Sequence, residues 1–129
     1  MRFLLDTHTL LWFLAGDPQL PAAVRERIEQ PHAQRLVSLA SIWEMAIKIS
    51  LGKLALGMPL RELVHDLLPT NGMLLFGIST LHLEQIVTLP IHHRDPFDRM
   101  LIAQALVEQI PILGRDSAFD AYPVERWWG

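Results

Sequence analysis

The chain has 129 residues, of which 50% are hydrophobic and 19% charged, and a chain this apolar buries its side chains, which excludes a disordered protein. The absence of cysteine excludes disulfides and thiolate metal sites. With 11 basic and 14 acidic side chains the formal net charge is −3, which argues against the strongly basic class of nucleic-acid-coating domains.

Prolines and glycines divide the sequence into short elements. In chain order, the pattern predicts a strand at Arg2–Leu5, helices at Thr7–Ala15 and Pro21–Gln30, a strand at Arg35–Ser38, helices at Ser41–Leu51 and Leu60–Leu68, a strand at Met73–Ile78, helices at Thr80–Val87 and Pro96–Gln109, a strand at Ile110–Leu113 and a short edge strand at Pro123–Trp127. Short apolar strands that alternate with helices indicate a three-layer α/β/α domain with a central parallel sheet of four to five strands. Ligands of such folds bind beyond the carboxyl ends of the strands.

No segment of the sequence is long enough to span a membrane. The longest uninterrupted apolar run, Leu10–Ala15, has six residues, against about 20 needed to cross a bilayer. An acid at position 6 also cuts short any signal-peptide core at the start of the chain. We therefore expect a cytoplasmic protein that forms a single domain over residues 1–129.

Four acidic residues are expected at the carboxyl edge of the sheet. Asp6 directly follows the first strand, and Glu44 lies near the start of the helix after the second. Asp98 lies in the first turn of the last long helix, and Asp116 follows the fourth strand by a short turn. Crossover helices of a parallel sheet begin at this edge, so the four carboxylates converge.

Carboxylates that lie close together indicate a bound cation. Two unit charges about 5 Å apart repel by about 3 kcal/mol at an effective dielectric near 20, and a divalent ion removes that repulsion. Oxygen ligands suit Mg²⁺ or Mn²⁺, and Mg²⁺ sites are typically completed by substrate phosphate. Such an ion activates a water for attack on a phosphodiester.

Each acid taken alone also has a structural explanation. Asp6 is a suitable N-cap for the helix that starts next to it. Ser41 and Glu44 form a capping-box pattern, and Glu44 lies four residues before Lys48, the spacing of a helical ion pair. Asp98 lies where a helix dipole favours an acid, and Asp116 fits an ordinary turn. Asp95 we assign to capping only, because Asp-Pro is an ordinary helix start.

The aromatic residues and histidines leave further questions open. The segment Leu10–Leu14 is apolar all around its helix, which indicates either a partner surface or deep core packing. Trp43 we assign to the core. His92 and His93 are adjacent and so poorly placed to share one metal, and we favour a role near substrate phosphate over metal ligation.

The longer motifs resemble one family. The segments Leu4–Thr7, Ser38–Lys48 and Gly52–Leu54, together with the long motif His93–Ala105, resemble a PIN domain, and specifically a VapC-type toxin of a bacterial type II toxin–antitoxin pair. The resemblance extends over essentially the whole chain. One departure is that Arg115, instead of Thr or Ser, precedes the fourth acid.

The resemblance implies an activity and partners. It implies that Asp6, Glu44, Asp98 and Asp116 bind Mg²⁺ or Mn²⁺ and cleave RNA, that the protein is a homodimer, and that a small cognate antitoxin binds it. Thr7 follows the first acid and is a candidate for orienting it. The other candidate substrate contacts are the basic residues near the acids in sequence, namely Lys48, Arg94, Arg99 and Arg115.

We therefore predict a metal-dependent endoribonuclease that acts as a toxin and hydrolyses RNA with a metal-activated water. One alternative is a receiver-like phospho-accepting signalling domain, which would need an acid after the third strand, where the chain has Ser79 and Thr80. The other is a PIN-fold binding scaffold without activity.

Overall fold

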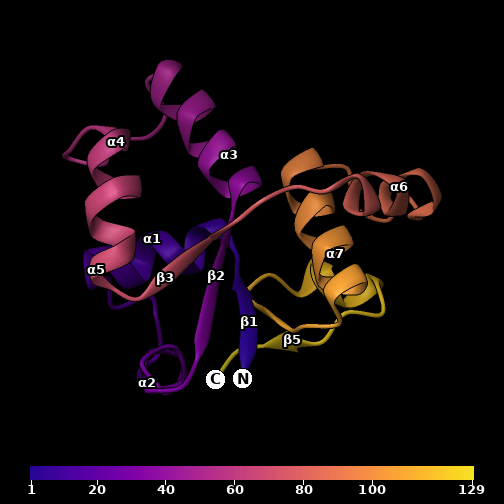
Figure 1. The fold of residues 1–129 in the computed structure, drawn as a ribbon, viewed down its shortest axis with the longest axis horizontal. Coiled ribbons are helices and arrows are strands. Elements are labelled where there is room, and N and C mark those ends of the chain that lie inside the picture. The colour runs from indigo at the N-terminus through magenta and orange to yellow at the C-terminus, as the bar shows by residue number, and fades with distance from the viewer.

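The computed structural model describes residues 1–129, and Figure 1 shows their arrangement. In chain order the elements are β1 (Arg2–Leu5), α1 (Thr7–Ala15), α2 (Ala22–Ile28), β2 (Gln34–Ser38), α3 (Leu39–Ser50), α4 (Leu60–Glu62), a π-helical segment (Leu63–Leu67), α5 (Leu68–Thr70), β3 (Met73–Phe76), α6 (Thr80–Thr88), α7 (Pro96–Glu108), β4 (Ile112–Leu113), a 3₁₀ helix (Ser117–Ala121) and β5 (Arg126–Trp127). None of the helices is long and apolar enough to cross a membrane.

The five strands form one parallel sheet in the order β3-β2-β1-β4-β5. The first strand of the sequence lies at the centre, with Leu4 opposite Leu36 of β2 and Ile112 of β4. The predicted α/β fold with a central parallel sheet is therefore confirmed. Several strands are shorter than expected, and β4 and β5 contain two residues each.

Each face of the sheet carries its own hydrophobic core, because successive side chains of a strand point to opposite faces. Phe3 and Leu5 point into a core with buried residues of α1, α2, α3 and the helices of residues 60–70. Leu4 points the other way, into a core with residues of α7 and the 3₁₀ helix. Figure 1 shows α1, α4 and α5 on one side of the strands and α6 and α7 on the other. This is the predicted three-layer arrangement.

The predicted helix Leu60–Leu68 extends further than the sequence indicates. Pro69 was expected to end it, but the helical path continues through Pro69 to Thr70. The helix widens before the proline, and the Leu68 N–H bonds to the Leu63 carbonyl five residues back. Pro69 then lies in the first turn of α5, where a missing N–H is tolerated.

The start of α3 corrects two expectations. The helix begins at Leu39, and Ser38 is its N-cap, with the Ser38 side chain accepting from Ala40 N at 3.0 Å. The capping box expected from Ser41 and Glu44 is therefore wrong, because both residues lie inside the helix and are buried. Trp43 is also not a core residue, since it is 58% exposed, and its ring meets that of Phe97 edge-on with centroids 5.1 Å apart.

Candidate metal centre

Asp6 is fixed at the junction of β1 and α1. Its backbone N–H donates to the Leu113 carbonyl at 3.0 Å, which ties the end of β1 to the end of β4. Its Oδ1 accepts from Thr9 N at 2.8 Å and so caps α1, as the structural explanation predicted. Capping uses one carboxylate oxygen only. The second oxygen, Oδ2, faces the turn after β4.

Gly114 makes room for that second oxygen. A Cβ at position 114 would lie 2.7 Å from Asp6 Oδ2 and 3.2 Å from Asp6 Cγ. Contacts of that length are essentially never found for a real Cβ, so only glycine lets the end of β4 approach the carboxylate this closely. The turn after β4 is therefore shaped around Asp6, and it leads directly to Asp116.

Asp98, Asp116 and His93 form the cluster that can hold a cation. Each offers one ligand atom, and these atoms all lie within 4.8 Å of one another. Asp98 Oδ2 lies 2.8 Å from His93 Nε2. Asp95 caps α7 by accepting from the backbone N–H groups of Phe97 and Asp98, as predicted, and this leaves the Asp98 side chain free of a capping role. Asp116 caps the 3₁₀ helix through Oδ1, which accepts from Ala118 N at 2.9 Å.

The acids of this edge influence one another. Burial raises the pKa of Asp98 to about 6; the hydrogen bond with His93 opposes the rise, and the charges of Asp95 and, to a smaller extent, Asp6 add to it. Burial also raises the pKa of Asp6, with a smaller contribution from the charge of Asp116. Asp6, Asp98 and Asp116 are thus close enough for their charges to interact. A cation would offset both the burial and the repulsion.

Glu44 lies outside that three-residue cluster, as Asp6 does, and both carboxylates are buried. Its Oε1 accepts from the Thr7 hydroxyl at 2.8 Å, and its Oε2 forms an ion pair with Lys48 Nζ at 2.9 Å. The Thr7 hydroxyl shares a further hydrogen bond with the Ser41 hydroxyl at 2.9 Å. Thr7, which directly follows Asp6 in the chain, therefore holds one oxygen of Glu44, and Lys48 balances the charge of Glu44.

The arginines named from the sequence have different surroundings. Arg99 donates to the carbonyls of Pro90 at 2.9 Å and Leu89 at 3.1 Å, so it holds the loop before α7 in place. Arg115 lies over the ring of Trp12, with its guanidinium carbon 4.7 Å from the centroid. Arg94 is exposed beside the cluster.

A polar hollow opens at this edge of the sheet. Its volume is about 310 Å³, and it is lined by Asp6, His8, Trp12, Arg115 and Asp116. It combines two carboxylates with a cationic side chain and an aromatic ring. These groups can accommodate a cation and a phosphate together.

The donor set fits a divalent metal ion. Carboxylate oxygens and one imidazole nitrogen are ligands of such ions. The crowding of partly desolvated carboxylates and the space that Gly114 leaves beside Asp6 are features that a cation explains and that capping alone does not. His93 is the member of this cluster that the sequence analysis did not favour as a ligand. Its signal was its place five residues before Asp98 in the loop that precedes α7.

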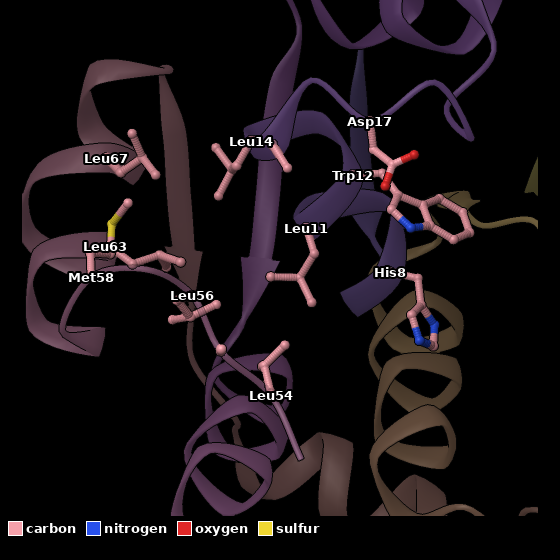
Figure 2. Close-up of a pocket in the computed structure, with 12 residues that line it drawn as sticks. His8, Leu11, Trp12, Leu14, Asp17, Leu54, Leu56, Met58, Leu63 and Leu67 are labelled. Carbon is pink, nitrogen blue, oxygen red and sulfur yellow. The ribbon is translucent and has the colours of Figure 1, made fainter. Parts of the chain in front are cut away.

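An apolar groove adjoins the polar hollow. Its volume is about 460 Å³, and it lies between α1 and the segment around residues 54–67. Figure 2 shows Leu11 and Leu14 of α1 facing Leu63 and Leu67 across it, with His8 and Trp12 at one side. His8 and Trp12 line both depressions.

Part of the predicted apolar surface of α1 is therefore open. Phe13, which the sequence also placed on that surface, is instead covered by the guanidinium of Arg25, whose carbon lies 4.7 Å from the ring centroid. Trp12 packs against Trp128, with ring centroids 6.1 Å apart.

The fold and the acidic edge define an α/β protein with a group of ligand atoms beyond the carboxyl ends of its strands that could hold a cation. The PIN domain family matches residues 3–125, and the chain belongs to this family, as the motifs indicated. Because the chain belongs to the PIN domain family, it is not the receiver-like signalling domain considered as an alternative. No curated protein matches the sequence.

Solved structures share the fold. A chain of VapBC2 from Rickettsia felis, crystallised with a DNA fragment from its promoter, is similar with a TM-score of 0.76 at 13% identity, and 100% of both chains is covered. A toxin–antitoxin complex from Klebsiella pneumoniae is similar with a TM-score of 0.62 at 19% identity, over 93% of this chain and 92% of that chain. FitAcB from Neisseria gonorrhoeae is similar with a TM-score of 0.60 at 18% identity, over 97% of this chain and 96% of that chain. At these identities the likeness concerns the fold.

Proposed function

We propose that the protein is a metal-dependent endoribonuclease and the toxin of a VapC-type toxin–antitoxin pair. The observation that carries the proposal is the convergence of Asp98, Asp116 and His93 within 4.8 Å at the edge where Asp6 lies beside Gly114. This cluster occupies the ligand-binding edge of a PIN fold. The solved relatives described as toxin–antitoxin complexes support the biological assignment.

The residues of the site have separable tasks. Asp6, Asp98 and Asp116 hold Mg²⁺ or Mn²⁺, which when bound supplies Lewis-acid charge and a more acidic water for phosphodiester hydrolysis. Thr9 N and Gly114 fix the orientation of Asp6. Arg115 and Arg94 contact RNA phosphates near the carboxylates, because guanidinium groups bind phosphate oxygens bidentately. Glu44, the remaining acid predicted as a ligand, is oriented by Thr7 and Lys48.

Metal-dependent RNA cleavage tests the activity. The purified protein is incubated with a mixed, end-labelled RNA pool in EDTA, and then with added Mg²⁺ or Mn²⁺. We expect internal cuts only with the metal, and loss of the cuts in Asp98→Asn. RNA binding without cleavage under every metal condition would favour the inactive scaffold.

The second part of the proposal is that the apolar groove binds the antitoxin. Most of its lining is aliphatic, and the polar groups His8 and Asp17 lie at its margin, which suits an amphipathic segment of another protein. Because His8 and Trp12 also line the acidic hollow, a segment seated in the groove would lie next to the metal site. Occupation of the groove would then hinder access of RNA.

The third part is a homodimer through α3. Four exposed apolar side chains follow one another every four residues along this helix, a spacing that places them on one face. They are Leu39, Trp43, Ile47 and Leu51. Light scattering of Trp43→Glu should show a shift from dimer to monomer, while Arg61→Glu on α4 should leave the mass unchanged. A Trp43→Glu protein that stays dimeric would place the interface elsewhere.

A further inference from the structure

His93 is turned toward the acids, and its neighbour His92 is not. The His93 ring places Nε2 2.8 Å from Asp98 Oδ2, whereas the His92 ring packs against Tyr122 with centroids 5.3 Å apart. The sequence interpretation treated the two histidines as a pair that would compete for one metal. That objection does not apply, because only one of them faces the cluster.

Several contacts hold His93 in this position. Its backbone N–H donates to the Tyr122 hydroxyl at 2.9 Å, and its carbonyl accepts from Arg99 Nη1 at 3.3 Å. Its ring meets Phe119 edge-on, at 90° with centroids 6.5 Å apart. Phe119 and Tyr122 belong to the segment that follows Asp116. The same short stretch of chain therefore positions both Asp116 and the imidazole.

The separations in the cluster match those of ligands that share an ion. Around a six-coordinate ion with ligand distances of about 2.1 Å, neighbouring ligand atoms lie about 3 Å apart and opposite ones about 4.2 Å apart. His93 Nε2 and Asp98 Oδ2 are 2.8 Å apart, and the full cluster spans no more than 4.8 Å. The 2.8 Å pair fits neighbouring positions on one ion, and any pair near the 4.8 Å limit would have to move closer to share it. A neutral imidazole is the commonest metal ligand and can carry its proton on Nδ1.

We propose that His93 Nε2 is a direct nitrogen ligand of the metal, and that it makes the site select Mn²⁺ over Mg²⁺. This inference rests on the proposed metal-dependent function. Mg²⁺ is a hard ion that takes oxygen ligands and keeps its waters, so it gains little from an imidazole. First-row transition ions bind imidazole readily, and affinity for mixed nitrogen and oxygen sites rises along that series from Mn²⁺.

A competing explanation is that His93 only donates a hydrogen bond to Asp98. Such a partner would orient the carboxylate and so affect every metal equally. His93→Gln separates the two explanations, because a glutamine amide can donate to Asp98 but offers no imidazole nitrogen. Pulsed EPR of bound Mn²⁺ gives the direct readout, since a coordinated imidazole produces a ¹⁴N modulation.

The experiment uses the full chain with Mn²⁺ alone, without RNA. We expect ¹⁴N modulation in the wild type and its loss in His93→Gln. In competition titrations, His93→Gln should weaken Mn²⁺ binding by ~10-fold or more, the scale on which metal sites respond to loss of a partner, and Mg²⁺ binding much less. Thermal unfolding in EDTA verifies that the variant is folded.

Two other histidine variants serve as controls. His92→Gln changes the adjacent ring, and His8→Gln changes the other histidine near the carboxylates. Both should keep the nitrogen modulation. The inference is overturned if the wild type binds Mn²⁺ without ¹⁴N modulation, if His8→Gln abolishes the signal instead, or if His93→Gln weakens both metals equally. A wild type that binds neither metal overturns the proposed function as well.

Discussion

The two depressions on either side of Trp12 are built from opposite kinds of residue. The polar hollow contains carboxylates that are each held by a backbone N–H group, as Asp6 is by Thr9 and Asp116 by Ala118. The apolar groove is lined mainly by hydrophobic side chains that also pack against the core, such as Leu11, Leu56 and Leu67. The hollow therefore offers carboxylates suited to a small ion, and the groove offers apolar surface suited to another polypeptide.

The largest expected effect concerns the acidic edge, which comprises the carboxylates of the hollow and the neighbouring Asp98. Asp6→Asn and Asp98→Asn should each lower RNA cleavage by at least about 100-fold, because each removes charge that balances a divalent ion. Asp95→Asn is the matched control, since Asp95 lies three residues from Asp98 and caps α7 with an oxygen that Asn also provides. Wild-type turnover of Asp98→Asn in Mg²⁺ or Mn²⁺ would contradict the site.

A substitution in the groove should affect binding of the antitoxin and not the rate of RNA cleavage. Leu56→Asp should weaken binding of the cognate antitoxin by about 2 kcal/mol, or roughly 30-fold in Kd, because it places a charge among aliphatic side chains. The partner to test is the small protein encoded beside this one. Leu81→Asp on α6, an exposed leucine away from the groove, should leave the affinity unchanged. Equal affinities for both variants would exclude the groove as the docking site.

The fold could be predicted because its signals are local. Most strands contain a short apolar run, and these three acids follow a strand or begin a helix, so the topology carries Asp6, Asp98 and Asp116 to one edge. The start of α3 could not be predicted, because Ser38 and Ser41 are both acceptable caps and only tertiary packing selects Ser38. The missed start also explains why the capping box predicted from Ser41 and Glu44 is wrong.

The details of the site depend on contacts between segments far apart in sequence. His93 reaches Asp98 because Tyr122 and Arg99 hold its backbone, and neither interaction has a sequence signature. The need for glycine at position 114 comes from the close approach of Asp6, which the sequence does not show. The sequence shows that α1 is apolar on all sides. It does not show which of these side chains remain accessible, because that depends on contacts such as the one between Arg25 and Phe13.

Gly114 offers a milder way to disturb the hollow. Gly114→Ala places a methyl group within 2.7 Å of Asp6 Oδ2, so the carboxylate must shift. A shift of about 1 Å can cost up to roughly 100-fold in rate, and we expect a loss of about 10-fold in cleavage together with weaker Mn²⁺ binding. Gly77→Ala, where a Cβ meets nothing within 4 Å, is the control. Unchanged metal affinity in Gly114→Ala would show that Asp6 Oδ2 does not face the metal.

The smallest expected effect is on stability without metal. The pKa of Asp98 is raised from 3.8 to about 6, chiefly by burial, so the folded protein holds this proton more tightly than the unfolded chain does. Stability that depends on this group is present below about pH 4 and is lost as the pH rises toward 6, because ionising the buried carboxylate disfavours the folded state. Asp98→Asn cannot ionise and should escape the loss.

Urea unfolding in EDTA at pH 4.5 and pH 7.5 measures this difference. Between pH 4.5 and pH 7.5, the free energy of unfolding of Asp98→Asn should rise relative to that of the wild type by on the order of 1 kcal/mol. The effect is moderated by water, because the Asp98 side chain is 24% exposed. Asp66→Asn, at an exposed position in the π-helical segment, should follow the wild type. If Asp98 instead stabilises the helix start, Asp98→Asn should be less stable at pH 7.5 and show the same pH slope as the wild type. That result would leave capping and the helix dipole as the reason for an acid at this position.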